Sequence, residues 1–216
     1  MEVIKHLFEF ILHIDKHLVE IVSNYNTWTY LILFAIVFCE TGLVVTPLLP
    51  GDSLLFAAGS IAALHDSALN PFYLAFVFFA AAFLGDNTNY FIGRFIGPKV
   101  YTSNYRFLNK KHIEKTQAFY TKHGGKTVIL ARFMPIVRTF APFVAGVGCM
   151  PYARFIGFSM FASLLWITTF LSAGYYFGQM EIIQKNFSLV SLGIIVVSLI
   201  PIIVGLLKSR FHKTAE

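Results

Sequence analysis

The sequence predicts an all-α membrane protein built from two inverted repeats, and three observations support this prediction. Of the 216 residues, 56% are hydrophobic and only 13% are charged, whereas soluble domains carry about 25% charged residues. Long apolar stretches recur, and a hydrocarbon core of about 30 Å needs roughly 20 apolar residues for each helical crossing. Two of these stretches are broken by Pro and Gly, through which a helix does not pass cleanly. The composition excludes a disordered chain, and the length favours one membrane domain over residues 1–216.

The first segment, residues 2–22, is predicted to be an amphipathic helix on the membrane surface. Its apolar residues recur at helical spacing, but charges such as Asp15 and Lys16 make it too polar to span a bilayer. These charges also argue against a cleavable signal peptide. His13 and His17 lie on its polar face without a third ligand near them, so we expect no metal and no cofactor.

Residues 28–64 are predicted to form a re-entrant hairpin. The apolar run that starts at Trp28 is too short to cross a bilayer, and Pro47, Pro50 and Gly51 then interrupt it. Broken backbone at membrane depth is tolerated only where protein or a water-filled cavity surrounds it.

Residues 71–93 are predicted to be a transmembrane helix, and residues 94–126 to be basic surface helices. The basic segment holds eight Lys or Arg residues and a single acidic residue, Glu114. The positive-inside rule therefore places this segment and the basic C-terminus in the cytoplasm. Anionic lipid headgroups are the expected partners of the positive charge, and nucleic acid is not.

A second re-entrant hairpin is predicted over residues 127–150, broken by Pro135 and Pro142. Two further spans follow, at 155–178 and 187–207.

The two halves resemble each other, because each is a broken hairpin followed by a span. Gly59 and Gly146 are 87 residues apart, and Tyr90–Gly93 and Tyr175–Gly178 are 85 apart. Because the basic loop lies between the halves, the repeat must be inverted. Inverted repeats with broken helices that meet near the midplane are a transporter architecture.

The hairpins carry four buried charges, each of which costs about 2.5–3.5 kcal/mol at the bilayer centre. Glu40 and Asp52 are the only charges in the first hairpin. Arg132 and Arg138 are the only charges in the second. If the hairpins face each other, these charges share one polar cavity, and Asp86 is a further candidate to line it.

The residue types suggest different roles for the arginines and for the acids. Guanidinium groups stay charged and suit phosphate, so Arg132 and Arg138 are candidate phosphate ligands. A dry site disfavours a charged carboxylate and a neighbouring guanidinium favours it, so Glu40 and Asp52 are candidate proton carriers and gates. The alternative is a purely structural pair of salt bridges. Trp28 and Trp166 are interpreted as interface or packing residues.

Five stretches together resemble the DedA family of bacterial inner-membrane proteins over nearly the whole chain. They are Phe38–Leu43, Pro47–Ser53, Gly85–Arg94, Lys122–Lys126 and Ala131–Pro142. The resemblance implies a core shared with VTT-domain lipid scramblases and a location in the bacterial inner membrane. It also implies that the family's essential acids and arginines correspond to four residues here: Glu40, Asp52, Arg132 and Arg138.

We therefore expect a lipid translocase rather than an enzyme, with protons and anionic or polyprenyl-phosphate lipids as partners. Recycling of undecaprenyl phosphate is the first function that the resemblance implies. A phospholipid scramblase that moves phosphatidylethanolamine, or a proton-coupled antiporter that supports the membrane potential, is the alternative. The apolar hairpins contain no His, which argues against a phosphatase. An oligomer is compatible with the sequence.

Overall fold

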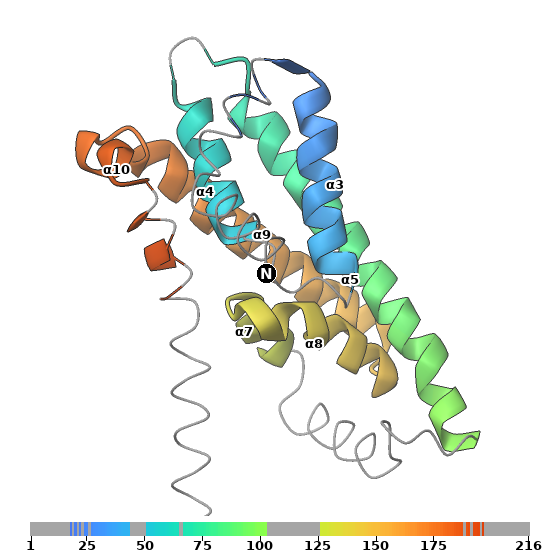
Figure 1. Ribbon diagram of the computed structural model, residues 1–216. Coiled ribbons are helices and arrows are strands. Elements are labelled where there is room, and N and C mark those ends of the chain that lie inside the picture. The colour runs from blue at the N-terminus through green and yellow to red at the C-terminus, as the bar shows by residue number, and fades with distance from the viewer. Residues whose placement is uncertain are drawn as a thin grey trace, which may run out of the picture.

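The computed structural model describes residues 18, 20, 22, 24, 25, 27–43, 51–64, 67–102 and 126–187, with 189, 190, 192–194 and 196. Within these residues every regular element is a helix, so the all-α prediction is confirmed (Figure 1). The helices are α3 (Trp28–Gly42), α4 (Gly51–Ala62), α5 (Pro71–Thr102), α7 (Lys126–Arg132), α8 (Pro135–Val147), α9 (Tyr152–Phe177) and α10 (Glu181–Lys185).

Several predicted features lie partly or wholly outside the described residues. These are the amphipathic helix at 2–22, the surface helices beyond Thr102, the last span at 187–207, and the breaks at Pro47 and Pro50. Leu18 and Val22 are described, and both are buried in the main hydrophobic cluster.

Helices α5 and α9 are long and apolar enough to cross a membrane, over Pro71–Gly97 and Tyr152–Phe177. Their outer faces carry large apolar side chains, such as Phe72 with 82% and Phe76 with 71% of its surface exposed. Large exposed apolar side chains of this kind are typical of a lipid-facing helix.

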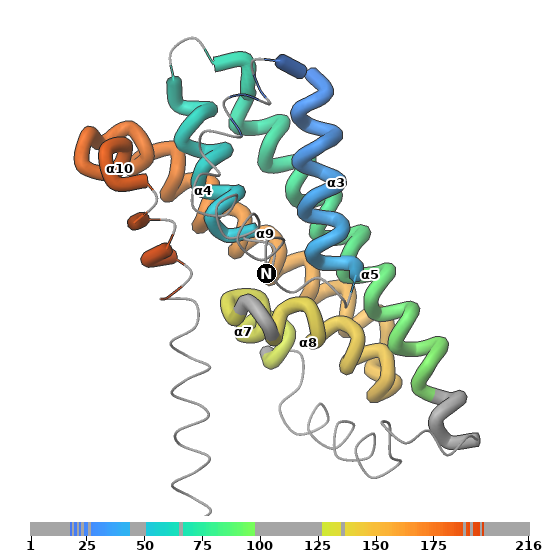
Figure 2. The backbone as a smooth tube through the Cα atoms, in the orientation of Figure 1, coloured from blue at the N-terminus to red at the C-terminus, as the bar shows by residue number. Residues whose placement is uncertain are grey.

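The four shorter helices pack on these two long ones. Helices α3 and α8 lie against α5, whereas α4 and α7 lie against α9 (Figure 2). The α3–α4 pair occupies the upper part of Figure 1 and the α7–α8 pair the lower part. The beginnings of α3 and α5 are tied together, because the Asn70 amide donates a 2.7 Å hydrogen bond to the Tyr30 hydroxyl. The inner ends of the short helices consequently meet in the middle of the molecule.

Two close helix crossings, made by glycines, hold this arrangement. The first places Gly174 of α9 and Gly178, the residue that caps this helix, against Phe56 and Ser60 of α4. The second places Gly93 and Gly97 of α5 against Phe143 and Val147 of α8. Small residues four apart allow helix backbones in membranes to approach closely.

The two crossings use corresponding positions, 81 residues apart on the long helices and 87 apart on the short ones. The spacing of 87 agrees with the Gly59 and Gly146 correspondence, but 81 replaces the 85 expected for the spans. Gly93 therefore does not end its helix as predicted. It lies at a crossing, and α5 continues to Thr102.

The break in the second hairpin lies at one of the two predicted prolines. The chain leaves α7 after Arg132, and Met134 is extended, with φ −113° and ψ 107°. Steric clash with Pro135 disfavours a helical conformation for the residue before it, whereas proline itself is tolerated in the first turn of α8. The prediction that Pro142 breaks the hairpin is wrong, because Pro142 lies inside α8. Its missing N–H costs one hydrogen bond to the Arg138 carbonyl, and the helix continues through it.

Candidate functional site

Five charged side chains are buried where the short helices meet. Glu40 comes from the end of α3, Asp52 from the start of α4, Asp86 from the middle of α5, Arg132 from the end of α7 and Arg138 from α8. Each is at most 5% exposed, so the five side chains lie close together and are shielded from solvent in this structure. Burial of a charge requires ion pairs and hydrogen bonds to offset the loss of water.

Arg138 is held by the two acids of the first hairpin. Its Nη1 atom donates to Asp52 and its Nη2 atom donates to Glu40. Both amino ends of the guanidinium are thus occupied by carboxylates that come from different helices. This three-residue cluster joins α8 to the inner ends of α3 and α4.

Gly51 contributes to this cluster because its backbone contacts Glu40. The Gly51 amide donates a 3.2 Å hydrogen bond to Glu40 Oε1. A Cβ atom at this position would lie 2.1 Å from Glu40 Oε2. Gly51, predicted as a hairpin break, therefore serves as a contact surface at the first residue of α4.

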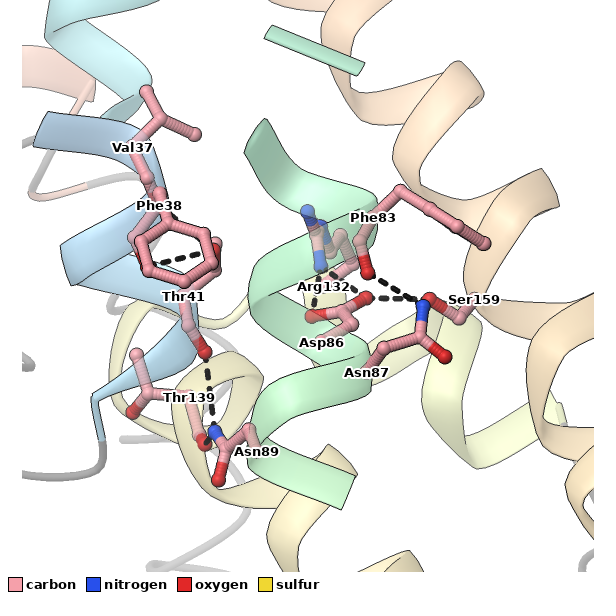
Figure 3. A network of polar contacts seen from close by, with 10 residues as sticks. All are labelled: Val37, Phe38, Thr41, Phe83, Asp86, Asn87, Asn89, Arg132, Thr139 and Ser159. Carbon is pink, nitrogen blue, oxygen red and sulfur yellow. Dashed lines mark hydrogen bonds and ion pairs between the residues drawn. The ribbon is translucent and has the colours of Figure 1, made fainter. Parts of the chain in front are cut away.

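Arg132 forms a second ion pair, with Asp86 (Figure 3). The Arg132 Nη1 atom lies 2.7 Å from both carboxylate oxygens of Asp86. Ser159 of α9 donates a 2.5 Å hydrogen bond to Asp86 Oδ2. The sequence indicated Asp86 as a candidate member of the site, but it did not indicate Arg132 or Ser159 as its partners.

Trp166 connects the two ion-paired clusters. The Cζ atoms of Arg132 and Arg138 lie 5.0 Å and 5.2 Å from its ring centroid. Its indole N–H donates a 2.8 Å hydrogen bond to Asp52 Oδ1. Cations at this distance from an aromatic face are attracted by its quadrupole. Trp166, interpreted from sequence as a packing or interface residue, is therefore a central member of the site.

Asn89 joins the backbones that carry one of the ion pairs (Figure 3). Its Nδ2 atom donates to the carbonyl of Thr41 at 3.1 Å and to that of Thr139 at 2.5 Å. These residues directly follow Glu40 and Arg138 in the sequence. One side-chain amide thus fixes the end of α3 relative to α8.

We expect Asn89→Ala to lower the free energy of unfolding by about 2 kcal/mol, because two buried carbonyl groups lose their interhelical donor. Thr88→Ala is the matched control, since the Thr88 hydroxyl donates only to the Leu84 carbonyl within its own helix. Thermal unfolding of the purified variants in detergent measures both effects. Equal losses of stability in the two variants would contradict this role of Asn89.

The α9 residues that the sequence did not assign to the site share a helical spacing, which was visible in the sequence but did not identify a site. Ser159, Ser163 and Trp166 recur at i, i+4 and i+7, so they line one face of α9. All three are fully buried. A charge-free span with such a face is compatible with simple helix packing, so the pattern alone did not indicate a site.

Several buried polar atoms of the site have no hydrogen-bond partner among the described residues. They are Arg132 Nε and Nη2, Arg138 Nε, Glu40 Oε2, Asn89 Oδ1 and Ser163 Oγ. Unpaired buried donors are rare and costly, and each needs a ligand, a water molecule or strain to explain it. The unpaired donors on both arginines are suited to an oxyanion.

Comparisons with known proteins identify the relatives of this chain. The VTT domain family matches residues 49–176. Protein DedA of Escherichia coli K12 is 50% identical over 100% of this chain and 97% of its own length. An uncharacterised membrane protein of Mycobacterium tuberculosis is 43% identical over 80% of this chain and 76% of its own. Inner membrane protein YghB of E. coli K12 is 29% identical over 91% of this chain and 86% of its own. No solved structure matches this chain.

Proposed function

Because this chain belongs to the DedA family of VTT-domain membrane proteins, we propose that it translocates a phosphate-bearing lipid across the bacterial inner membrane. Undecaprenyl phosphate is the expected substrate and protons are the expected coupling ions. In this proposal Arg132 and Arg138 bind the phosphate, while Glu40 and Asp52 gate the site and carry protons.

The observation that carries this proposal is the set of unpaired donors on two buried arginines. Arg132 and Arg138 are 3% and 4% exposed, yet three of their guanidinium nitrogens lack a partner among the described residues. Buried ion pairs contribute little net stability compared with apolar packing, so a purely structural role explains the cluster poorly. A phosphate oxyanion matches both the charge and the donor geometry.

The charge balance of the cluster supports proton coupling. Three carboxyl groups face two guanidinium groups, so the site has one excess negative charge when all five are ionised. A proton neutralises that excess, and a bound phosphate adds negative charge that further protons offset. Phosphate binding and protonation of the carboxyl groups should therefore favour each other, as linkage requires.

The closed state of the site indicates that translocation needs a conformational change. A lipid phosphate can reach the arginines only if helices that now cover them separate. The two corresponding glycine crossings support two inverted repeats, each with a re-entrant hairpin whose second helix packs on the span of the other half. Rocking of one such unit against the other would open the site to alternate sides of the membrane. The proposal includes several membrane crossings and a cytoplasmic C-terminus.

The test is translocation of a polyprenyl phosphate in liposomes that contain the purified protein. We expect flux in the wild type, loss of flux in Arg132→Ala and Arg138→Ala, and a decrease when a protonophore collapses the pH gradient. The control is a substitution of Lys185 or Glu181, which form an exposed ion pair outside the buried cluster. Intact flux in both arginine variants would refute the phosphate role, and indifference to the protonophore would refute the coupling.

The excess negative charge of the cluster favours one alternative, a proton-coupled cation antiporter. In that case the arginines are counter-charges and the carboxylates bind the cation. Parallel flux assays with alkali cations and with labelled phospholipids, phosphatidylethanolamine included, separate these functions in the same liposomes.

A further inference from the structure

The two arginines of the site differ in which of their donors remain available. Arg138 uses both Nη atoms for carboxylates, which leaves only Nε without a partner among the described residues. Arg132 uses Nη1 alone, for both oxygens of Asp86. Its Nε and Nη2 atoms, which form one side edge of the guanidinium plane, are both without a partner in the described part of the chain.

An open side edge of a guanidinium offers two parallel N–H donors, one from Nε and one from Nη2. Phosphate and carboxylate accept such pairs in fork geometry, and these bonds are both stronger and more specific than single ones. A lysine supplies the same charge without the fork. Arg132 can therefore bind an oxyanion through two bonds without releasing Asp86, whereas Arg138 cannot do so without releasing a carboxylate.

The orientation of that open edge depends on Asp86. The Arg132 guanidinium is fixed at its Nη1 end by Asp86, and Asp86 is fixed in turn by the Ser159 hydroxyl. Trp166 lies against the face of the guanidinium at 5.0 Å. With one end and one face occupied, the Nε–Nη2 edge is the part of the guanidinium that is left without a partner among the described residues.

We propose that Arg132 is the phosphate ligand, and that Asp86 and Ser159 are positioning residues that orient its open edge. The ion-paired cluster of Arg138, Glu40 and Asp52 instead holds the surrounding helices in the closed conformation. This inference rests on the proposed function and refines it, because the two arginines no longer share one role. The ligand is a group with two free phosphate oxygens, carried by a lipid headgroup or present as inorganic phosphate.

The fluorescence emission of Trp166 provides the measurement of phosphate binding. The chain has two tryptophans, and Trp28 is 67% exposed at the beginning of α3, so Trp28→Phe leaves Trp166 as the single indole. Because the Arg132 guanidinium lies 5.0 Å from its ring, an oxyanion bound at that side chain should change its emission. The probes are farnesyl phosphate, farnesol and inorganic phosphate, titrated into the full-length Trp28→Phe protein in detergent.

We expect Arg132→Lys and Asp86→Asn each to raise the half-saturating farnesyl phosphate concentration about tenfold or more, as loss of charge-assisted bonds implies. Ser159→Ala should raise it less. Arg138→Lys should raise half-saturation clearly less than Arg132→Lys does, while lowering the maximal translocation rate in liposomes. Because Asp86 acts through Arg132, Arg132→Lys combined with Asp86→Asn should bind no more weakly than Arg132→Lys alone.

Additive effects in the double variant would overturn the positioning role of Asp86, since a residue of merely structural importance would weaken binding independently. An equal rise in half-saturation for Arg138→Lys and Arg132→Lys would overturn the division of roles. If farnesyl phosphate binds no better than farnesol in the wild-type site, the proposed function itself fails. Binding of inorganic phosphate as tight as that of farnesyl phosphate would refute the lipid as the source and support the Arg132 edge as the phosphate site.

Discussion

Replacement of Arg138 by methionine should destabilise the protein by about 3–5 kcal/mol and abolish lipid translocation, because two buried carboxylates lose their shared counter-charge. Glu40 and Asp52 are 1% and 5% exposed, so water cannot take the place of the guanidinium without opening the site. Loss of stability should appear as a large decrease of the unfolding temperature in detergent.

Simultaneous removal of all three charges distinguishes stability from function. Glu40→Gln, Asp52→Asn and Arg138→Met together leave no unpaired charge, and neutral replacements of a buried ion cluster are often neutral or stabilising. We expect this triple variant to recover most of the lost stability and to remain inactive in the liposome assay. Recovery of transport together with stability would show that the cluster has only a structural role, holding the helices together.

The matched control for both variants is Lys185→Met. Its ion pair with Glu181 is 3.1 Å long, but the side chains are 75% and 85% exposed. Exposed pairs contribute little, so we expect no measurable change in unfolding temperature or transport. A comparable decrease would mean that the assay responds to any loss of charge.

The sequence predicted the membrane class, the helical fold and the charged residues of the site, because these follow from local patterns. Burial of Glu40, Asp52, Arg132 and Arg138 could be anticipated, since a charge in an apolar stretch has few other solutions. The break before Pro135 was predictable for the same local reason. The family resemblance over the whole chain agrees with the 50% identity to a relative.

The partners of these charges could not be predicted from local patterns. Arg132 pairs with Asp86 on a span, not with an acid of the first hairpin, because the pairing depends on how α7 packs against α8 and α9. The role of Trp166 depends on the position of two guanidiniums from other helices. Pro142 was misjudged because packing on α5 holds α8 together despite one missing hydrogen bond.

The glycine crossings were also only partly visible in sequence. A pair of glycines four apart on a span predicts a close helix contact, but it does not identify the partner. In the structure each pair lies against the short helix of the opposite half. Because each crossing joins a long helix of one half to a short helix of the other, a change at either crossing should disturb both halves of the site.

Gly174→Ala should therefore be among the most damaging single substitutions in the protein. An added Cβ would lie 2.0 Å from the carbonyl oxygen of Phe56, a backbone atom that cannot rotate away. Overpacking of this kind costs about 1–3 kcal/mol, and we expect a value near the upper end because α4 must move as a unit. Movement of α4 displaces Asp52 from Arg138 and Trp166, so transport should fall together with the unfolding temperature.

Gly157→Ala is the matched control on the same helix, since no neighbouring element in the described part of the chain lies within 4 Å of its added Cβ. Alanine is favoured over glycine in a helix by about 1 kcal/mol, so this variant should be at least as stable as the wild type. Gly93→Ala should be as damaging as Gly174→Ala, because its Cβ would lie 2.1 Å from the Phe143 carbonyl oxygen. If Gly93→Ala were harmless while Gly174→Ala was not, the two crossings would not be equivalent, and the repeat built on them would lose its support.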